Sequence, residues 1–569
     1  MKLKRLIALM LCVLTVGTCS MATACTKPEG PSQDGKTINV KMVLAGYGTD
    51  WLQDIADAFE TLYAEEGYKV NILEPLNSFT GSAALNEMRM TYEETGYDLV
   101  ITTGNTIQKA LGLDGEGYGP CIANMDDVYN NGAINFDGSV DSTTIKDLAS
   151  AQGVAERVYI NDGHYYTMGY VNSIKGLVCN TKVMQKYGIT NLPRTTDELF
   201  EMFDIILNED KKFSDVTGIR PIAWAGGNGY GYALDPQYVN IAQMMGVSEY
   251  DKFFNLDYLL DQDGKIDPDG WKIYEDEMWK DLFEVYLQEW DVLYSSLGSK
   301  TQEHTDADAQ VVRGQAAFMF NGDYFYNEVR NDFERYLGDV RFTKVPLISA
   351  LGTKLGLHTD EETCDEILRL IVEKCDNSVA TAQIETEVEA AISGVDINET
   401  QIERIREARS VCGGGGGTGM YVMKDSPVKD ITYKLLRMVA SADAGKVFSK
   451  YGMIGMYNPA EPETTAHQFN KDTAYHIANK TYTVTSSLVP GSVRALTNMF
   501  LIPNYNAAMP VRINGDSLSA GNIMPSSGKA SDRDYVAFAN TLYTKVLNET
   551  RDGWKDLIEK GGYSLATKN

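Results

Sequence analysis

The sequence predicts an α/β protein built from two globular lobes, and three observations support this fold class. The chain has 569 residues, more than a single hydrophobic core usually organises. Residues 38–102 alternate between strand-like and helix-like segments, the order typical of a parallel sheet with helices on both faces. Residues 162–203 contain a long extended run between helical segments, and a run of this kind can connect one lobe to another.

The first lobe is predicted from hydrophobic periodicity. The predicted order is strand 38–45, helix 50–66, strand 70–73, helix 83–94 and strand 97–102. The strands are rich in β-branched and apolar residues, and the first helix carries apolar side chains at helical spacing. Ligands of parallel sheets bind beyond the carboxyl ends of the strands. The loops after these strands are therefore candidates for ligand contacts: 46–51, 74–81 and 103–106.

The rest of the chain is predicted to be mainly helical. Residues 141–158 are interpreted as a helical or irregular connector, and the capping sequence at 195–198 begins the helix 198–207. The later predicted elements follow in chain order: a strand leading into a glycine-rich loop at 219–231, helices at 238–245, 271–297 and 310–318, a strand turning into a helix at 317–324, a strand at 339–347, helices within 359–411, a strand at 420–423, and helices at 430–440, 444–451 and 535–558.

Two motifs that would bring a cofactor or a metal are excluded by their context. Residues 414–419 fit G-x-G-x-x-G, but a helix precedes them and a strand follows, the reverse of the order in a dinucleotide site. Met420 also stands where a phosphate-binding loop needs Lys. The acidic stretch 260–270 has Leu259 or Lys265 where a calcium loop requires its first Asp. We therefore expect no cofactor and no metal site.

The N-terminus has the pattern of an export signal. Basic residues precede an apolar run at 6–16 that is too short for a normal membrane span, and small residues follow at 22–24. We predict a signal peptide at 1–24. Cys25, directly after Ala-Thr-Ala, resembles the cysteine of a bacterial lipobox, which becomes a lipidated mature N-terminus. The polar segment 25–36 then serves as a linker, and the protein is expected at the extracellular face of the cell membrane.

Charge and cysteine usage narrow the function classes further. The formal net charge of −28 disfavours nucleic acid and anionic ligands through repulsion. Five cysteines remain after Cys25: Cys121, Cys179, Cys364, Cys375 and Cys412. Their odd number and the absence of C-x-x-C spacing argue against a zinc site or a disulfide framework. A pair between Cys364 and Cys375 stays possible in principle, but free thiols are the simpler interpretation.

Several separated motifs follow one another in a recognisable order: the lipobox, the first β-α-β unit, DGHYY at 162–166 leading to 177–180, the 187–199 segment with its Pro-Arg-Thr-Thr-Asp-Glu-Leu, RGQAAFM at 313–319, GDY at 322–324, and 417–423. In this order they resemble the extracellular solute-binding proteins of ABC importers, in particular the sugar-binding group that includes maltose-binding proteins. The resemblance covers most of 25–460. Thr196 and Tyr324 stand where that family typically has Trp.

The resemblance implies two three-layer α/β lobes joined by hinge strands, with the ligand in the cleft between them. The implied N-terminal lobe comprises 37–168 and 424–488. The implied C-terminal lobe comprises 173–418 and 489–569, with a helical insertion at 350–411 that the smaller family members lack. The expected function is capture of a carbohydrate, specifically an oligosaccharide, by a lipid-anchored monomer that delivers it to ABC permease subunits. No chemistry on the ligand is implied, so no enzymatic activity is expected.

A sugar cleft needs aromatic faces to cover C–H patches and planar polar groups to meet hydroxyls. The candidates lie on strand-end loops, on the first crossing or at the family's motif positions: Tyr47, Trp51, Asn105, Tyr170, Trp224, Asn228, Tyr230, Asp323, Tyr324 and Gly417. Among them Trp51 and Tyr324 fit a core position equally well, and Trp224, followed by two glycines, is the preferred ligand contact.

Two alternatives remain open. The same fold could bind a peptide or another solute. A secreted glycoside hydrolase would need two carboxylates flanking a bond, but with 79 acidic residues such a pair always exists and carries little information. Other enzyme motifs are missing from the sequence: there is no H-E-x-x-H, and Ser519 stands where a nucleophile elbow around Ser517 needs its closing Gly.

Overall fold

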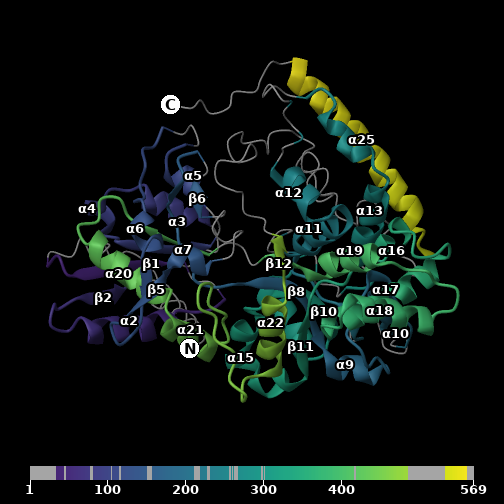
Figure 1. Cartoon of the computed structure of the whole chain (residues 1–569), viewed down its shortest axis with the longest axis horizontal. Coiled ribbons are helices and arrows are strands. Elements are labelled where there is room, and N and C mark those ends of the chain that lie inside the picture. Colours follow the sequence, from purple (N-terminus) through teal and green to yellow (C-terminus); the bar gives the residue numbers. More distant parts are fainter. Residues whose placement is uncertain are drawn as a thin grey trace, which may run out of the picture.

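The computed structural model describes residues 34–43, 46–76, 81–103, 106–113, 117–149, 157–159, 161–209, 218–226, 231–255, 258, 261, 267–291, 293–295, 299, 301–414, 418–484 and 532–559. Within them the chain is an α/β protein with a smaller and a larger sheet, each covered by helices (Figure 1). The predicted fold class is confirmed.

The smaller sheet contains the strands predicted for the first lobe. Its order is β13-β3-β1-β2, formed by β1 (Thr37–Met42), β2 (Lys69–Ile72), β3 (Leu99–Thr103) and β13 (Thr418–Val422). Strand β1 pairs in parallel with β2 and β3, and β13 is antiparallel to β3. Helix α2 (Asp50–Leu62) buries its apolar stripe, including Trp51, Ile55 and Phe59, against the core of this lobe. The helices α3 (Gly81–Met88), α20 (Lys429–Val439) and α21 (Ala442–Lys450) complete it.

The larger sheet has the order β14-β12-β8-β10-β9, with β11 paired to β8. Its strands are β8 (Ile174–Asn180), β9 (Arg220–Ile222), β10 (Ala316–Gly322), β11 (Val340–Thr343), β12 (Val411–Gly414) and β14 (Tyr482–Val484). The helices around it include α10 (Thr196–Glu209), α11 (Gly231–Met245), α12 (Val247–Asn255), α13 (Met278–Glu289), α14 (His304–Val312) and α15 (Phe325–Phe333). Helix α25 (Tyr535–Glu559) lies along α13 at the outer side of this lobe (Figure 1).

The chain passes between the two sheets where their strands approach each other. Met168 forms a β-bridge with Met420 of β13, and β8 of the larger sheet begins six residues later, at Ile174. Val171 forms a second bridge with Gly455, and the Asn172 amide donates to the Ile454 carbonyl over 2.8 Å. The extended run predicted within 162–203 therefore crosses from the smaller sheet to the larger one, beside a return segment near 455.

Residues 350–411, which were expected to form a helical insertion, are mainly helical. It consists of α16 (Ala350–Lys354), α17 (Glu361–Asp376), α18 (Thr381–Ala391) and α19 (Glu399–Ser410). Its buried apolar side chains, among them Ile367, Ile371 and Ile405, belong to the main core cluster of the second lobe. The insertion is thus part of the folded core, because its helices bury their apolar faces against the same cluster as α11 and α13.

Three predicted elements differ in the structure. The connector at 141–158 includes a strand, β5 (Val140–Thr144), which pairs with β4 (Gly132–Ile134) before the short helix α7 (Ile145–Leu148). The helix predicted at 310–318 ends at Val312, and β10 begins at Ala316, because Gly314 adopts a positive φ of 73° that ends the helix. The helix predicted from 271 begins as a 3₁₀ helix, η4 (Gly270–Glu275).

The lobe boundary near the C-terminus also differs from the expected 424–488. Strand β14 pairs with β12 in the larger sheet, and α22 (Gln468–Ala478) packs against β11. Residues 468–484 therefore lie with the larger sheet, whereas α20 and α21 lie with the smaller one. Local periodicity predicts whether a segment is a helix or a strand, but it does not predict which sheet the segment packs with.

Two further expectations concern covalent and membrane features. All five cysteines after Cys25 are free thiols, as predicted. Among the described residues no helix combines the length and the apolar character needed to cross a membrane. The predicted signal peptide, Cys25 and most of the linker lie outside the described residues.

Candidate functional site

The loop after β1 contacts the end of β10, so that residues from the two sheets meet. The Tyr47 hydroxyl donates to the Asp323 carboxylate, with both oxygens at 3.0 Å, and lies 2.7 Å from Ser173 Oγ. The Ser173 hydroxyl donates to the same carboxylate over 2.5 Å, and the Ile174 amide donates to it over 3.2 Å. Three segments distant in sequence are therefore joined at one carboxylate: the first strand-end loop, the first crossing and the end of β10.

Burial controls the protonation of this cluster. Asp323 is 1% exposed, and burial raises the pKa of its carboxyl to about 6 even though Ser173, Tyr47 and the Ile174 amide favour the charged form. Burial and the neighbouring Asp323 also raise the pKa of Tyr47 well above its ordinary value. Tyr47 therefore keeps its proton near neutral pH and acts as a hydrogen-bond donor to the carboxylate.

A second pair of buried carboxyl groups lies beside this contact. Asp308 of α14 and Glu328 of α15 face each other across a hydrogen bond, and burial raises the pKa of Glu328 to about 7 and that of Asp308 as well. Repulsion from Glu328 adds to the rise in the pKa of Asp308, and Asn321 donates to Asp308 Oδ1 over 2.8 Å. A Cβ atom at Gly46 would lie 2.6 Å from Glu328 Oε1 and 3.0 Å from Tyr324 Cβ, so a larger residue here would displace the Glu328 side chain.

Aromatic side chains surround the contact on both sides. Tyr324 is half-buried and meets Tyr47 edge to face, with ring centroids 6.0 Å apart at an interplanar angle of 89°. Trp51 stacks on Tyr170 at 4.5 Å and 17°, and both rings are buried in the core of the first lobe. The structure therefore gives Trp51 and Tyr170 a packing role that holds the first crossing against α2, while Tyr324 is only partly buried.

Trp224 follows β9 in the second lobe, as predicted, but its side chain is only 7% exposed. Its ring meets Trp290 at 4.9 Å and 77°, within the main core cluster. Its backbone carbonyl accepts a hydrogen bond from Gln302 Nε2 over 2.9 Å. The Trp224 indole nitrogen is buried without a hydrogen-bond partner among the described residues, so an unused donor is present at this strand end.

Four predicted contacts cannot be placed, because they lie outside the described residues: Asn105, Asn228, Tyr230 and Gly417. The sequence did not single out Ser173, Asp308 or Glu328. Ser173 lies in the predicted crossing, but no spacing distinguishes it from its neighbours. The Asp308–Glu328 pair joins two helices that are separate in sequence, so only the folded chain reveals it.

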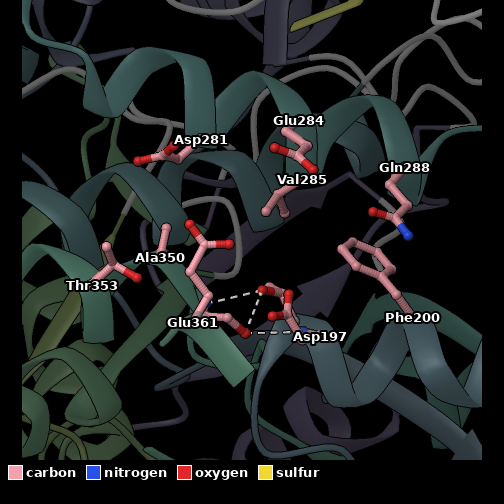
Figure 2. Close-up of a pocket in the computed structure, with 11 residues that line it drawn as sticks. Asp197, Phe200, Asp281, Glu284, Val285, Gln288, Ala350, Thr353 and Glu361 are labelled. Carbon is pink, nitrogen blue, oxygen red and sulfur yellow. Dashed lines mark hydrogen bonds between the residues drawn. The ribbon is translucent and has the colours of Figure 1, made fainter. Parts of the chain in front are cut away.

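A separate cavity of about 180 Å³ lies between α10, α13 and the insertion, and it is strongly acidic (Figure 2). Asp197, Asp281, Glu284 and Glu361 line it, and Asp281 and Glu284 project from α13 above it in the figure. Burial and mutual repulsion raise the pKa of Asp281 to about 6 and that of Glu284 to about 7. Among the described residues no group of three or more His, Cys, Asp or Glu side chains has an arrangement that could hold a metal ion.

Comparisons with known proteins identify the family. The model of the bacterial extracellular solute-binding protein family matches residues 45–352, more than half of the chain. A search of curated proteins by sequence gives no match.

Solved structures with the same fold are only distantly related in sequence. The bacterial solute receptor AcbH, described as preferring β-D-galactopyranose, has 13% identity and a TM-score of 0.55, covering 92% of this chain and 99% of its own. A chitin oligosaccharide binding protein has 13% identity and a TM-score of 0.52, with coverages of 92% and 99%. The binding protein RafE in complex with raffinose has 12% identity and a TM-score of 0.50, with coverages of 90% and 99%. The chain therefore belongs to the bacterial extracellular solute-binding protein family and is a solute-binding receptor rather than an enzyme.

Proposed function

We propose that this protein captures an oligosaccharide between its two lobes and delivers it to an ABC importer. The observation that carries the proposal is the contact of Tyr47 with Asp323, because it joins the loop after β1 to the end of β10. Strand-end loops of the two sheets thus meet, and ligands of parallel α/β sheets bind beyond strand ends. The structural relatives that bind galactopyranose, chitin oligosaccharide and raffinose support a carbohydrate as the ligand.

The chemistry around this contact suits a neutral sugar. We propose that the half-buried ring of Tyr324 covers a C–H face of the sugar beside Tyr47. Asp323 is 1% exposed and accepts from Tyr47 and Ser173, so its proposed role is to orient these hydroxyls toward the ligand. Trp224, whose ring packs against Trp290 in the second lobe, remains a proposed contact through its indole N–H, which has no partner among the described residues. We retain Asn105, Asn228, Tyr230 and Gly417, which lie outside the described residues, as proposed contacts, with Trp51 and Tyr170 supporting the site from the core.

A mechanism follows from the two-lobed architecture. Ligand contacts with both lobes favour the conformation in which the lobes are close together, since a ligand shifts the population toward the state that it binds more tightly. The surface created by this approach would be recognised by the permease subunits. We propose that the monomeric protein is held at the extracellular face of the membrane by a lipid on Cys25, with 25–36 as a linker.

Isothermal titration against a panel of linear oligosaccharides, with a peptide pool as the competing class, tests the proposed ligand. We expect at least one oligosaccharide to bind with saturation at one site and to be recovered unchanged. Release of shorter sugars would contradict a transport role. Tighter binding of peptides than of every sugar would contradict the carbohydrate assignment. Membrane fractionation of a Cys25→Ser variant tests the anchor separately, since the variant should leave the membrane fraction.

A further inference from the structure

A second cavity lies in the larger lobe, apart from the contact between the lobes. It has a volume of about 440 Å³ and lies between α22, β11 and residues 192–194, which precede α10. Its lining residues come from these segments and from the ends of α17 and α19, and none comes from the smaller sheet. The cavity shares no residue with the Tyr47–Asp323 contact. It is therefore a distinct place in the fold for a ligand.

The lining of this cavity is positive although the chain as a whole is negative. Among the lining residues four cationic side chains face two carboxylates, in a protein of net charge −28. The residues concerned are Arg194, Arg341, Arg409, Lys471, Asp376 and Asp472. Arg194 is also paired with Glu198 at 2.7 Å and Glu373 at 3.0 Å, so Arg341 and Lys471 are the cations that can meet a ligand. Charges more than about 10 Å away are largely screened at ordinary ionic strength, so the local cations determine which ligand this cavity attracts.

The two carboxylates are already bound by arginines. Arg409 contacts Asp376 through Nε at 3.0 Å and Nη2 at 2.8 Å. Arg341 contacts Asp472 through Nε at 2.6 Å and Nη2 at 2.9 Å. A guanidinium has five N–H groups, and the Arg341 side chain is 38% exposed, so it retains donors for a ligand. Lys471 uses one of its three donors on the Thr464 carbonyl, at 2.6 Å.

His476 supplies the complementary acceptor. It lines the cavity, is 8% exposed, and its Nδ1 has no hydrogen-bond partner within the described part of the chain. Burial, followed by the charges of Lys344 and Arg409, lowers the pKa of His476 to about 3, so the ring is neutral near pH 7. Its interaction with the backbone of Phe342 favours a proton on Nε2. Nδ1 therefore carries a lone pair that can accept a hydrogen bond from a ligand.

We propose that this cavity binds a small oxyanion that also carries a hydroxyl group, such as hydrogen phosphate or a hydroxycarboxylate. Arg341 and Lys471 donate to the anionic oxygens, and charge-assisted hydrogen bonds of this kind are among the strongest in proteins. His476 Nδ1 accepts from the hydroxyl of the ligand. Asp376 and Asp472 remain paired with their arginines and fix the orientation of the guanidinium groups.

Calorimetric titration of the protein with hydrogen phosphate, D-gluconate and sulfate at pH 7.5 tests this assignment. We expect saturable binding of hydrogen phosphate or gluconate, and the tighter of the two identifies the class of oxyanion. Sulfate has no hydroxyl at this pH and should bind at least about tenfold more weakly. Lys471→Met should weaken binding by about tenfold or more, since one charge-assisted contact is lost. Arg335→Gln removes an exposed charge over Tyr336 elsewhere on the same lobe and should leave the affinity unchanged.

The role of His476 has its own pair of variants. The amide of Asn can occupy the place of Nδ1, whereas that of Gln can occupy the place of Nε2. His476→Asn should therefore retain more affinity than His476→Gln, with circular dichroism showing that both variants are folded. The proposal is overturned if no anion gives saturable heat, or if Lys471→Met binds as tightly as the wild type. Equal affinity for sulfate and hydrogen phosphate would overturn the assignment of His476 as the acceptor.

Discussion

The Tyr47 hydroxyl lies 3.0 Å from both carboxylate oxygens of Asp323, although the two residues are 276 positions apart in the chain. Tyr47 follows the first strand of the smaller sheet, and Asp323 follows β10 of the larger sheet. A single hydroxyl therefore joins the two lobes at the strand ends where the proposed ligand binds. The contribution of this contact to the free energy of unfolding can be measured directly.

Replacing Tyr47 with Phe removes the donor and leaves a buried carboxylate with fewer partners. The expected loss is about 1–3 kcal/mol in the free energy of unfolding, the usual cost of an unsatisfied buried polar group. Urea unfolding followed by tryptophan fluorescence measures it. Tyr336→Phe serves as the matched control, because Tyr336 is 37% exposed. Equal stability of the two variants would contradict a stabilising contact between the lobes.

The raised pKa of Asp323, about 6 against an ordinary value of 3.8, makes stability depend on pH. The folded protein binds this proton more tightly than the unfolded chain. The contribution is therefore fully present below the unfolded pKa and is lost as the pH rises through about 6, by up to about 3 kcal/mol. Asp323→Asn keeps an acceptor but cannot ionise, so its stability should fall less between pH 4.5 and 7.5 than that of the wild type. If Asp323→Asn loses as much stability as the wild type between these two pH values, the assignment is contradicted.

The acidic cavity of Figure 2 should reduce stability at neutral pH. Burial and the nearby Asp281, Asp197 and Glu361 raise the pKa of Glu284 to about 7, so ionising it in the folded state is unfavourable. Glu284→Gln should then stabilise the protein at pH 7.5 by about 1 kcal/mol, after allowing for solvent screening, and have little effect at pH 4.5. Thermal unfolding at both pH values measures this. The exposed Glu366→Gln makes the same charge change and should be nearly neutral.

The attachment of α25 depends on a buried ion pair. Arg533 Nε lies 3.1 Å from Asp291 Oδ2, with side chains 5% and 0% exposed, and Tyr535 donates to the same oxygen over 2.9 Å. Asp291→Asn removes the charged partner of Arg533 in this buried ion pair, which should cost about 3–5 kcal/mol and increase hydrogen exchange along α25. Asp552→Asn, at the exposed pair with Arg551, should cost only about 0–1 kcal/mol. Equal exchange in the two variants would show that the apolar face of α25 alone attaches it.

Much of the fold could be predicted because its signals are local. The apolar stripe of α2 and the β-branched strands β1 and β3 are visible in short windows, and the extended run at 162–203 was predicted as the crossing between the lobes. Strand β10 was predicted from 317, but its start was also assigned to a helix at 310–318, because the apolar pattern of α14 continues into it. Strand β14 pairs with β12, about 70 positions away in the chain, and local sequence patterns cannot predict a pairing over this distance.

The candidate site was predicted only in outline. Tyr47 and Asp323 were chosen from strand ends and a family motif, and the structure brings them together. Trp224 was placed correctly after β9, but an aromatic residue beside glycines does not reveal whether its ring faces solvent, and Trp290 covers it. The sequence could not identify Ser173 or the Asp308–Glu328 pair as site residues. The role of each depends on a contact with a residue that is distant in sequence.

The central claim is that the ligand binds between the lobes beside Tyr47, and the affinity of Tyr324→Ala tests it most directly. With the sugar identified by titration, this variant should bind at least about tenfold more weakly than the wild type, since it removes the half-buried aromatic ring next to Tyr47. Tyr336→Ala, which removes an exposed tyrosine elsewhere on the same lobe, should bind as the wild type does. Undiminished affinity in folded Tyr324→Ala would contradict the claim.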